Sequence, residues 1–163
     1  MARIVDLQGK THSISCIACA IQKGSATPIG GTIVSSVHFR AEQDFEYPIP
    51  GFVIIVSKRH FYGIDDMTKN ERMDFIEFVS RTRKAMRKTL GVEFVHMILE
   101  EDTSSSHFHV WLFPRYVWME KKFGRKIESI MPIMRYAKKY MKKASNLKEV
   151  RESISALKSS LSR

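Results

Sequence analysis

The spacing of apolar positions divides the chain into a strand-forming part and a helical part. Residues 32–39 are rich in β-branched side chains, and residues 52–56 form a short continuous apolar run, so each stretch predicts a strand. Residues 92–100 and 106–114 predict two more strands, joined as a hairpin by the polar segment between them. The acidic segment 42–50 contains two prolines, which a central strand does not tolerate, and it predicts a connection.

A long amphipathic helix is predicted over residues 69–90. Thr68 and Glu71 form a capping box, because the threonine side chain can accept from a backbone N–H three residues on and the glutamate can reach back. Apolar residues then recur at helical spacing until Gly91, a residue that commonly ends helices. Beyond the last strand the pattern is helical again, with helices predicted at about 122–143 and 147–161, separated near Asn146.

These C-terminal helices carry the whole net charge of the protein. The chain has a formal charge of +10, and residues 121–163 contain 13 Lys and Arg against three Glu. Such a segment indicates an anionic partner, either nucleic acid, nucleotide phosphates or a membrane surface. A solvated helical face that keeps the protein in solution explains the charge equally well. The sequence leaves open whether the helices pack on the sheet, on a partner subunit or on neither.

Length and composition favour an ordinary globular protein. The chain has 163 residues, 44% of them hydrophobic and 27% charged, which fits one domain with an appended tail. No apolar run is long enough to span a membrane, and the N-terminus lacks the pattern of a secretory signal. Two cysteines do not make a disulfide scaffold. We therefore expect a cytoplasmic protein without a membrane partner.

Two histidines on one strand are the strongest candidates for chemistry. Successive side chains of a strand point to opposite faces, so His107, His109 and Trp111 are predicted to share one face while the residues between them point into the core. Histidine acts as a nucleophile, proton shuttle or metal ligand because its free pKa lies near neutrality. A pair of imidazoles on a polar face favours a function over a purely structural role.

A second candidate is the pair Cys16 and Cys19 in a Cys-x-x-Cys spacing. This spacing occurs in zinc sites and in redox pairs. A redox pair is expected within a βαβ unit, which the pattern does not show. A zinc site needs two further ligands. Two free buried cysteines are the third interpretation.

The motifs together resemble the histidine triad superfamily. Its mark is His-x-His-x-His on a strand, which stands here as His107-Phe-His109-Val-Trp111. The strand at 52–56, closing in Ser-Lys-Arg-His60 before a turn and a capped helix, is similar to the apolar strand of the family that ends in Pro-Lys-x-His.

The resemblance covers about residues 16–115. It implies an α+β fold, mainly an antiparallel sheet with one long helix. We therefore expect a nucleotide-binding domain over residues 1–118 and a basic helical extension over residues 119–163. The resemblance also implies a nucleotide or dinucleotide substrate and a homodimer, and the basic extension adds nucleic acid as a candidate partner.

The family's site residues can be carried over by position. The resemblance makes His109 the nucleophile that attacks the α-phosphorus of a nucleotide conjugate, such as a dinucleoside polyphosphate, to form a nucleotidyl-histidine. His107 orients the site in the family's metal-free members. Asp44 matches the acid that binds the ribose hydroxyls, and Ser104 and Ser106 fall in the turn that donates to the phosphate. The implied activity is nucleotidyl hydrolysis or transfer.

Zinc-containing relatives, including the hexose-1-phosphate uridylyltransferases, imply a metal site here. Their ligands correspond to Cys16, Cys19, His60 and His107. Four protein ligands leave no open position, so the implied zinc is structural.

The third motif position departs from the family, because Trp111 replaces the histidine. An indole has one N–H donor and no acceptor, so it cannot deliver a proton to a leaving group. The alternative to an enzyme is therefore a nucleotide- or nucleic-acid-binding module of the same fold that has lost turnover.

Overall fold

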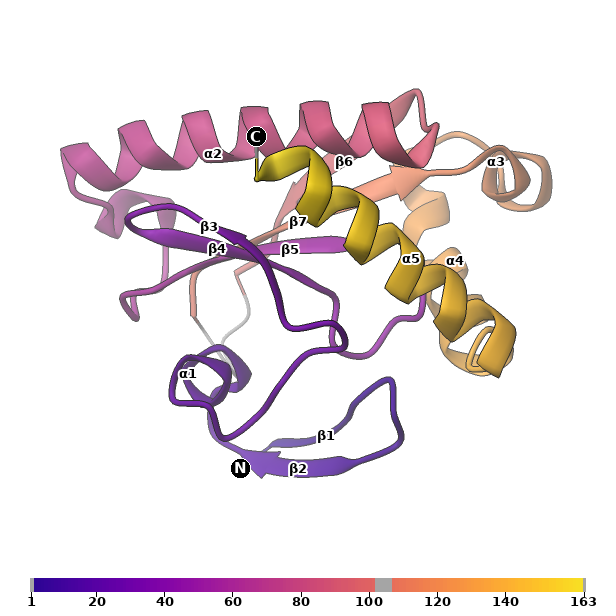
Figure 1. Ribbon diagram of the computed structural model, residues 1–163, viewed down its shortest axis with the longest axis horizontal. Coiled ribbons are helices and arrows are strands. Elements are labelled where there is room, and N and C mark those ends of the chain that lie inside the picture. The colour runs from indigo at the N-terminus through magenta and orange to yellow at the C-terminus, as the bar shows by residue number, and fades with distance from the viewer. Residues whose placement is uncertain (1, 102–106, 163) are drawn as a thin grey trace.

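A five-stranded antiparallel sheet forms the centre of the protein (Figure 1). The computed structural model describes residues 2–101 and 107–162. The spatial order of the strands is β3-β4-β5-β7-β6. Their bounds are Thr32–Ser35 (β3), Phe39–Gln43 (β4), Val53–Ser57 (β5), Phe94–Leu99 (β6) and His109–Arg115 (β7). The predicted α+β class with a mainly antiparallel sheet is confirmed.

The long helix α2 (Lys69–Leu90) has the predicted bounds. The Thr68 hydroxyl accepts from the Glu71 N–H at 3.2 Å, and the Glu71 carboxylate accepts from the Thr68 N–H at 2.8 Å, which completes the capping box. Gly91 ends the helix with φ of 63°, a left-handed conformation that a residue without a Cβ adopts at little cost.

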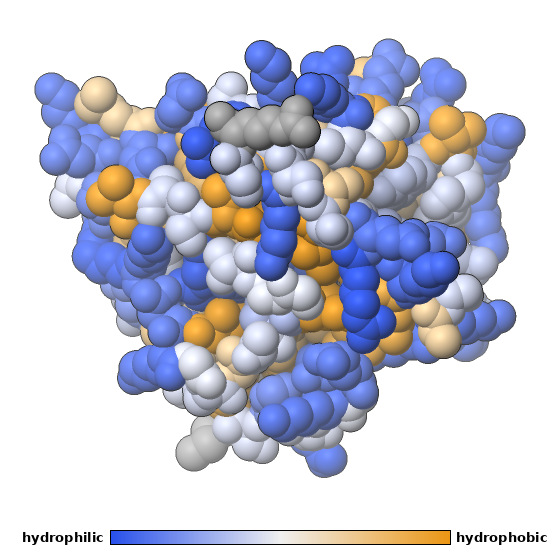
Figure 2. Space-filling view, viewed as in Figure 1, coloured by the Kyte–Doolittle hydropathy of each residue, from blue (hydrophilic) through white to orange (hydrophobic). Residues whose placement is uncertain are grey.

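Two helices cover one face of the sheet. The C-terminal helix α5 (Ala144–Leu161) crosses this face diagonally in Figure 1 and packs beside α2. Apolar side chains of α2, α5 and the sheet form a first hydrophobic cluster, which includes Phe39, Val53, Phe75, Met86, Val110, Ile154 and Leu157. The surface seen in this view is largely hydrophilic, with small apolar patches between the helices (Figure 2).

The opposite face of the sheet is covered by other helices. At one end of this face, α3 (Val117–Phe123), the 3₁₀ turn η2 (Ile127–Ser129) and α4 (Ile130–Tyr140) pack on a second cluster. This cluster includes Ile49, Phe52, Phe113, Met119, Ile133 and Met134. The helices after residue 118 therefore pack on both faces of the sheet and share both cores with the rest of the chain.

The N-terminal residues build the other end of that second face. Strands β1 (Ala2–Val5) and β2 (Thr11–Ile14) form a separate hairpin, and α1 (Ile17–Gln22) follows it, below the sheet in Figure 1. A short 3₁₀ turn, η1 (Ile64–Asp66), connects β5 to α2. None of the helices in the described part of the chain is long and apolar enough to cross a membrane.

The predicted strand at 32–39 and connection at 42–50 are partly wrong. The structure has two strands, β3 and β4, with a turn between them and β4 running to Gln43. Asp74 of α2 accepts from the Ser36 hydroxyl and from the His38 N–H, both at 2.8 Å. Because the group that fixes the turn is distant in sequence, the local pattern did not reveal it.

The predicted helices at 122–143 and 147–161 also need correction. Gly124, with φ of 85°, ends α3 inside the first predicted range, and α4 begins only after η2. Asn146 lies within α5 rather than between helices, and its side-chain amide donates to the Pro48 carbonyl at 2.5 Å. Asparagine is common at helix boundaries, but here a tertiary hydrogen bond holds it in the helix.

Candidate functional site

Strand register places the candidate residues on one face of the sheet. In the β5–β7 pair, His109 lies opposite Val56 and Trp111 lies opposite Ile54. In the β4–β5 pair, Ile54 also lies opposite Glu42. Because residues directly opposite one another share a face, His109, Trp111 and Glu42 line the same side of the sheet.

The alternation predicted for this strand is confirmed. Phe108, Val110 and Leu112 are at most 2% exposed and belong to the first cluster. His109 and Trp111 are half-buried and face the other way. These three apolar side chains pack in the core and hold the strand in place, so the imidazoles point to the opposite face of the sheet.

A cavity of about 380 Å³ lies on this face, between the sheet, α1 and the segment that follows β4. His107, His109 and Trp111 line its floor, while Ile17 and Ile21 of α1 form one wall. Asp44, Phe45, Glu46 and Tyr47 form another wall, and Ile4, Glu100 and Met131 also line it. The cavity thus combines apolar walls with a few converging polar groups.

One hydrogen bond selects the tautomer of His109. Its Nδ1 lies 3.0 Å from the carbonyl oxygen of His107. A carbonyl can only accept, so Nδ1 carries the proton and Nε2 of the neutral ring keeps a free lone pair. A half-buried imidazole whose Nε2 lone pair faces a cavity is a competent nucleophile.

Four side chains from three separate segments of the chain converge beside the cavity. Cys16 Sγ lies 3.5 Å from His107 Nδ1 and 4.0 Å from His60 Nδ1. Cys19 Sγ lies 3.4 Å from His107 Nδ1 and 3.2 Å from His60 Nδ1. All four candidate ligand atoms lie within 4.8 Å of one another.

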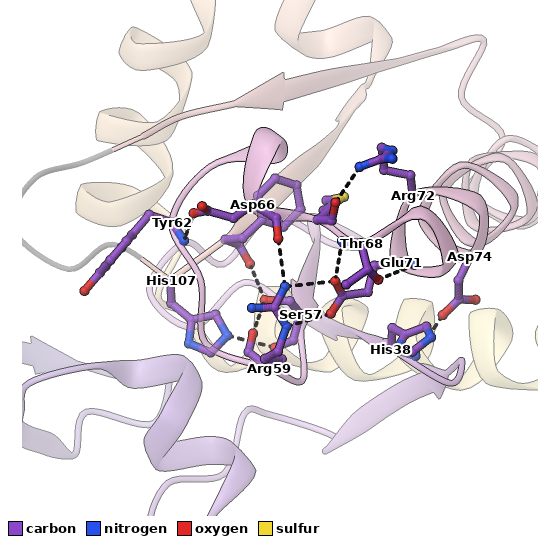
Figure 3. A network of polar contacts seen from close by, with 12 residues as sticks. His38, Ser57, Arg59, Tyr62, Asp66, Thr68, Glu71, Arg72, Asp74 and His107 are labelled. Carbon is purple, nitrogen blue, oxygen red and sulfur yellow. Dashed lines mark hydrogen bonds and ion pairs between the residues drawn. The ribbon is translucent and has the colours of Figure 1, made fainter.

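The four donors fit a zinc ion. Tetrahedral zinc with Zn–S of ~2.3 Å and Zn–N of ~2.05 Å puts sulfur and nitrogen about 3.5 Å apart, which the observed separations bracket. His107 Nε2 lies 2.8 Å from the Ser57 carbonyl (Figure 3), so its proton is on Nε2. Its Nδ1 lone pair faces the two cysteines. Burial lowers the pKa of His107 to about 4, which keeps the ring neutral. The cluster is compatible with zinc.

Arg40 fastens the cysteine-bearing helix to the sheet. Its guanidinium is buried and donates to the Ala18 carbonyl at 2.7 Å and to the Gln22 side chain, both in α1. It also pairs with the buried Glu42 carboxylate at 2.5 Å. A buried pair satisfied by further hydrogen bonds fixes geometry, because loss of either partner leaves an uncompensated charge.

A second ion pair fixes the turn that carries His60. Arg59 donates from Nε and Nη2 to the two oxygens of Glu71, each at 2.9 Å, and from Nη2 to the Asp66 carbonyl at 2.9 Å (Figure 3). Its guanidinium also lies 4.5 Å from the centre of the Phe61 ring. These contacts hold the segment after β5 against the start of α2.

Replacing Glu71 with glutamine should destabilise the protein in a pH-dependent way. The hydrogen bonds from Arg59 lower the pKa of Glu71 from 4.5 to about 2. A lowered folded-state pKa stabilises the protein above about pH 4.5, and the stabilisation is lost as the pH falls toward 2. Thermal unfolding of wild type and Glu71→Gln between pH 2 and 7 should therefore differ most near neutrality. A difference that stays constant down to pH 2 would contradict this account.

Asp44 lies directly after β4 and organises the wall of the cavity. Its Oδ1 accepts from the backbone N–H of Glu46 at 2.9 Å and of Tyr47 at 2.6 Å. Among the described residues these are its side-chain partners, so Oδ2 is left for a ligand. Burial raises the pKa of Asp44 to about 7. Lys138 of α4 pairs with Glu46 at 2.8 Å and ties the same turn to the C-terminal helices.

Trp111 stands at the third motif position, and its ring lies between those of His109 and Phe52. Its ring is 6.3 Å from that of His109 and stands edge-on to Phe52 at 5.8 Å. It borders the second cluster and lines the cavity at the same time. The indole can offer a flat apolar surface to a ligand and a single N–H donor, but no proton.

Of the predicted site residues, the structure brings His109, His107, Trp111 and Asp44 to one cavity, with Cys16 and His107 shared between the cavity and the cysteine–histidine cluster. Ser104 and Ser106 lie outside the described residues.

Sequence reasoning missed the pair of Arg40 and Glu42, which stand four and two residues before Asp44 on the same side of β4. Their period-two spacing would have indicated a shared face, had residues 39–43 been recognised as a strand. It also missed Lys138, for which the sequence carries no signal, because its partner Glu46 is far away in the chain.

Several solved structures have the same fold. A zinc-bound histidine triad family protein from Mycobacterium smegmatis is 19% identical, with a TM-score of 0.64 over 91% of this chain and 94% of that one. A hypothetical histidine triad nucleotide-binding protein from Sulfolobus tokodaii is 18% identical, with a TM-score of 0.57 over 88% and 94%. A HIT family hydrolase from Legionella pneumophila is 17% identical, with a TM-score of 0.50 over 62% and 93%.

No protein-family model and no curated protein matches the sequence. The likeness is therefore one of structure at low sequence identity. The antiparallel sheet, the long capped helix and the position of the two motif histidines all agree with the resemblance found in the sequence. The chain has the fold of the histidine triad proteins.

Proposed function

We propose that the protein is a nucleotidyl hydrolase or transferase of the histidine triad superfamily, acting at the α-phosphate of a nucleotide conjugate such as a dinucleoside polyphosphate. The observation that carries the proposal is the hydrogen bond from His109 Nδ1 to the His107 carbonyl, which leaves Nε2 as a nucleophile at the cavity. The nucleotide-binding and hydrolase names of two structural neighbours support it.

The reaction would proceed in two displacements. His109 Nε2 attacks the α-phosphorus, a nitrogen–phosphorus bond forms, and the leaving group departs with the electron pair of the broken bond. Water or another acceptor then attacks the same phosphorus and releases its proton to solvent, while the electron pair of the nitrogen–phosphorus bond returns to the imidazole. Because Trp111 supplies no proton, the site suits a leaving group that is stable as an anion, such as a pyrophosphate tail.

Asp44 would hold the ribose through its free carboxylate oxygen. Its Oδ1 is already engaged by two backbone N–H groups, which fix the side chain in place. Hydrogen bonds to a charged acceptor are stronger than those to a neutral one, so the ionised form should bind ribose hydroxyls better.

Replacing Asp44 with asparagine should raise KM about tenfold with little change in kcat or Tm, because the amide oxygen keeps the turn but loses the charge. The pKa of Asp44 lies at about 7, so wild-type nucleotide affinity should fall as the pH drops from 8 to 6. Affinity of the Asp44→Asn variant should change less over this interval, and its remaining change should reflect the phosphate of the ligand, whose second pKa is about 6. Isothermal titration with a nucleoside monophosphate measures the affinity of wild type and variant at each pH. Identical pH profiles would contradict the role of Asp44 in ribose binding.

Cys16, Cys19, His60 and His107 would hold zinc. Four protein ligands give the ion a structural role, and when bound it supplies a cross-link between α1, the turn after β5 and the start of β7. The cavity wall formed by α1 would depend on this cross-link. His107 would then position His109 through its carbonyl, while its own ring faces the cluster.

A homodimer remains part of the proposal. The edge strand β6 exposes Phe94, Met97 and Leu99, and α2 exposes Met73 and Ile76 beside it. An unpaired edge strand with apolar side chains can add the same strand of a second copy. Light scattering of the purified chain would distinguish a dimer from a monomer.

The alternative is a nucleotide-binding module without turnover, favoured by the tryptophan at the third motif position. Release of mononucleotide from dinucleoside polyphosphates, nucleotide sugars and nucleoside phosphoramidates separates the two. Release above background supports the enzyme and identifies the leaving group. Nucleotide binding without release from any conjugate supports the module and contradicts the enzyme.

A further inference from the structure

Helices α3 and α4 carry a strongly basic surface outside the cavity. Residues 117–143 contain nine Lys and Arg against two Glu. Exposed members on and between the helices are Lys121, Lys122, Arg125, Lys126, Arg135 and Lys139. Both acids, Glu120 and Glu128, are already opposite a basic side chain, at 2.9 and 4.0 Å. The other basic side chains of these helices outnumber the acids, and a surface of this charge attracts a polyanion.

Four aromatic rings lie within this basic surface and touch one another. Ring centres of Trp118 and Phe123 in α3 lie 6.0 and 5.5 Å from that of Tyr136 in α4. The Tyr136 ring in turn lies 5.0 Å from that of Tyr140. We call these four residues the aromatic row. The row is contributed by two helices, α3 and α4, whose packing brings the rings into one continuous patch.

Lysine side chains stand directly over the row. Lys122 Nζ lies 3.7 Å from the centre of the Tyr136 ring and 5.7 Å from that of Phe123. Lys139 Nζ lies 5.1 Å from the centre of the Tyr140 ring. These lysines are exposed, so they can move from a ring face to a phosphate when a base takes their place.

The aromatic row is partly exposed to solvent and is not simply part of the second hydrophobic cluster. The buried side chains of α4 are Ile130, Ile133, Met134 and Ala137, whereas Tyr136 is half-buried and Tyr140 is 51% exposed. Among the residues that the structure describes around the cavity, none belongs to the row. The row is therefore a separate surface from the proposed active site.

We propose that the aromatic row and the lysines and arginines around it bind single-stranded nucleic acid, with unpaired bases against the rings and phosphates on the cations. Base–aromatic stacking combined with a basic groove is how proteins bind single strands with little sequence preference. A duplex hides its base faces and would use only the charges. The rings of the row meet edge-on or tilted, and Tyr140, the most exposed of them, offers its face to a base.

The two tryptophans make the site directly observable, because one lies in the row and the other in the cavity. In a Trp111→Phe variant only Trp118 emits, and an oligothymidine or oligouridine should quench it. In a Trp118→Phe variant only Trp111 emits, and the oligonucleotide should leave its emission unchanged. Quenching confined to Trp111, or no quenching with either variant, would overturn the proposal.

Binding affinity should follow the row rather than net charge. In fluorescence anisotropy with a labelled single strand, Tyr140→Ala should weaken binding about tenfold, and Tyr140→Phe should restore most of it. The double variant Lys122→Gln with Lys139→Gln should weaken binding and lower the salt slope by about 1.4. Its matched control, Lys148→Gln with Arg151→Gln on α5, changes net charge equally and should bind like wild type. Equal losses in both double variants would overturn the proposal.

Two competing ligands complete the test with the full chain. A blunt duplex of the same length should bind at least about fivefold more weakly than the single strand. Vesicles of phosphatidylserine and phosphatidylcholine test the exposed Val117 and Ile127 as a lipid-binding edge. The proposal would be overturned in favour of a membrane surface by two results together. Wild type would sediment with the vesicles and bind no single strand, and Tyr140→Ala would sediment less.

Discussion

Replacing His109 with alanine is expected to lower mononucleotide release from a cleaved conjugate by at least about 1,000-fold, because the variant has no nucleophile for the first displacement. His109 Nδ1 is engaged by the His107 carbonyl, so Nε2 is the atom that the variant removes from the reaction. The fold should persist, since His109 is half-buried at a cavity and belongs to neither hydrophobic cluster. Release is measured by chromatography under single-turnover conditions.

A histidine elsewhere provides the control. His38 is half-buried in the β3–β4 turn, and its hydrogen bonds to Asp74 and Lys58 use the backbone, so alanine keeps them. His38→Ala should release mononucleotide like wild type. His109→Ala should still bind a nucleoside monophosphate, as followed by Trp111 emission in a Trp118→Phe background. Comparable release by His109→Ala and wild type would remove His109 from the reaction.

Substituting Cys19 with serine is expected to abolish zinc binding and lower Tm by about 10 °C. Zinc binding energy is folding energy when the ligands come from separate elements, and here they join α1 to the sheet and to the turn after β5. Wild type purified with zinc should contain one ion per chain by plasma mass spectrometry, and a chelator should lower its Tm by a similar amount.

The chelator separates loss of metal from loss of a side chain. It should have little effect on the Tm of Cys19→Ser, because that variant has no zinc to lose. Ser15→Ala, an exposed neighbour just before α1, is the matched control and should keep both zinc and wild-type Tm. A structural zinc would be contradicted if wild type holds no zinc after refolding in excess zinc. It would also be contradicted if the chelator leaves the Tm of wild type unchanged.

Local signals predicted the parts of the fold that local interactions build. The capping box of Thr68 and Glu71 and the left-handed Gly91 fix both ends of α2 within a few residues of chain, and the prediction was accurate there. The β3–β4 turn and the end of α3 escaped prediction. Asp74, distant in sequence, fixes the turn, and Gly124 stands inside an otherwise continuous helical pattern.

The candidate site was predictable where a motif carried it. Alternation placed His107 and His109 on one face, and the four residues of the cysteine–histidine cluster followed from the resemblance. Residues that support the site were not predictable in the same way. Arg40 donates to the Ala18 carbonyl of α1, 22 residues earlier in the chain, and Lys138 pairs with Glu46, 92 residues earlier. Such contacts depend on how helices pack on the sheet, which periodicity does not encode.

Packing of the C-terminal helices was the largest open question. Their apolar stripes are visible in the sequence, but their destination is not. The structure places α5 on the face that carries α2, and α3 and α4 on the face that carries the cavity. The lysines and arginines of α3 and α4 therefore lie on the outer sides of these helices, beside the aromatic row.

The central claim is that His109 forms a covalent bond to the α-phosphorus of its substrate. It is tested most directly by stopping single-turnover reactions in alkaline denaturant, which preserves a nitrogen–phosphorus bond, and measuring intact protein mass. The account predicts a transient gain of one nucleoside monophosphate less water in wild type, located on His109 by peptide sequencing and absent from His109→Ala. Substrate cleavage by wild type without any adduct on this peptide, or with an adduct on another residue, would contradict it.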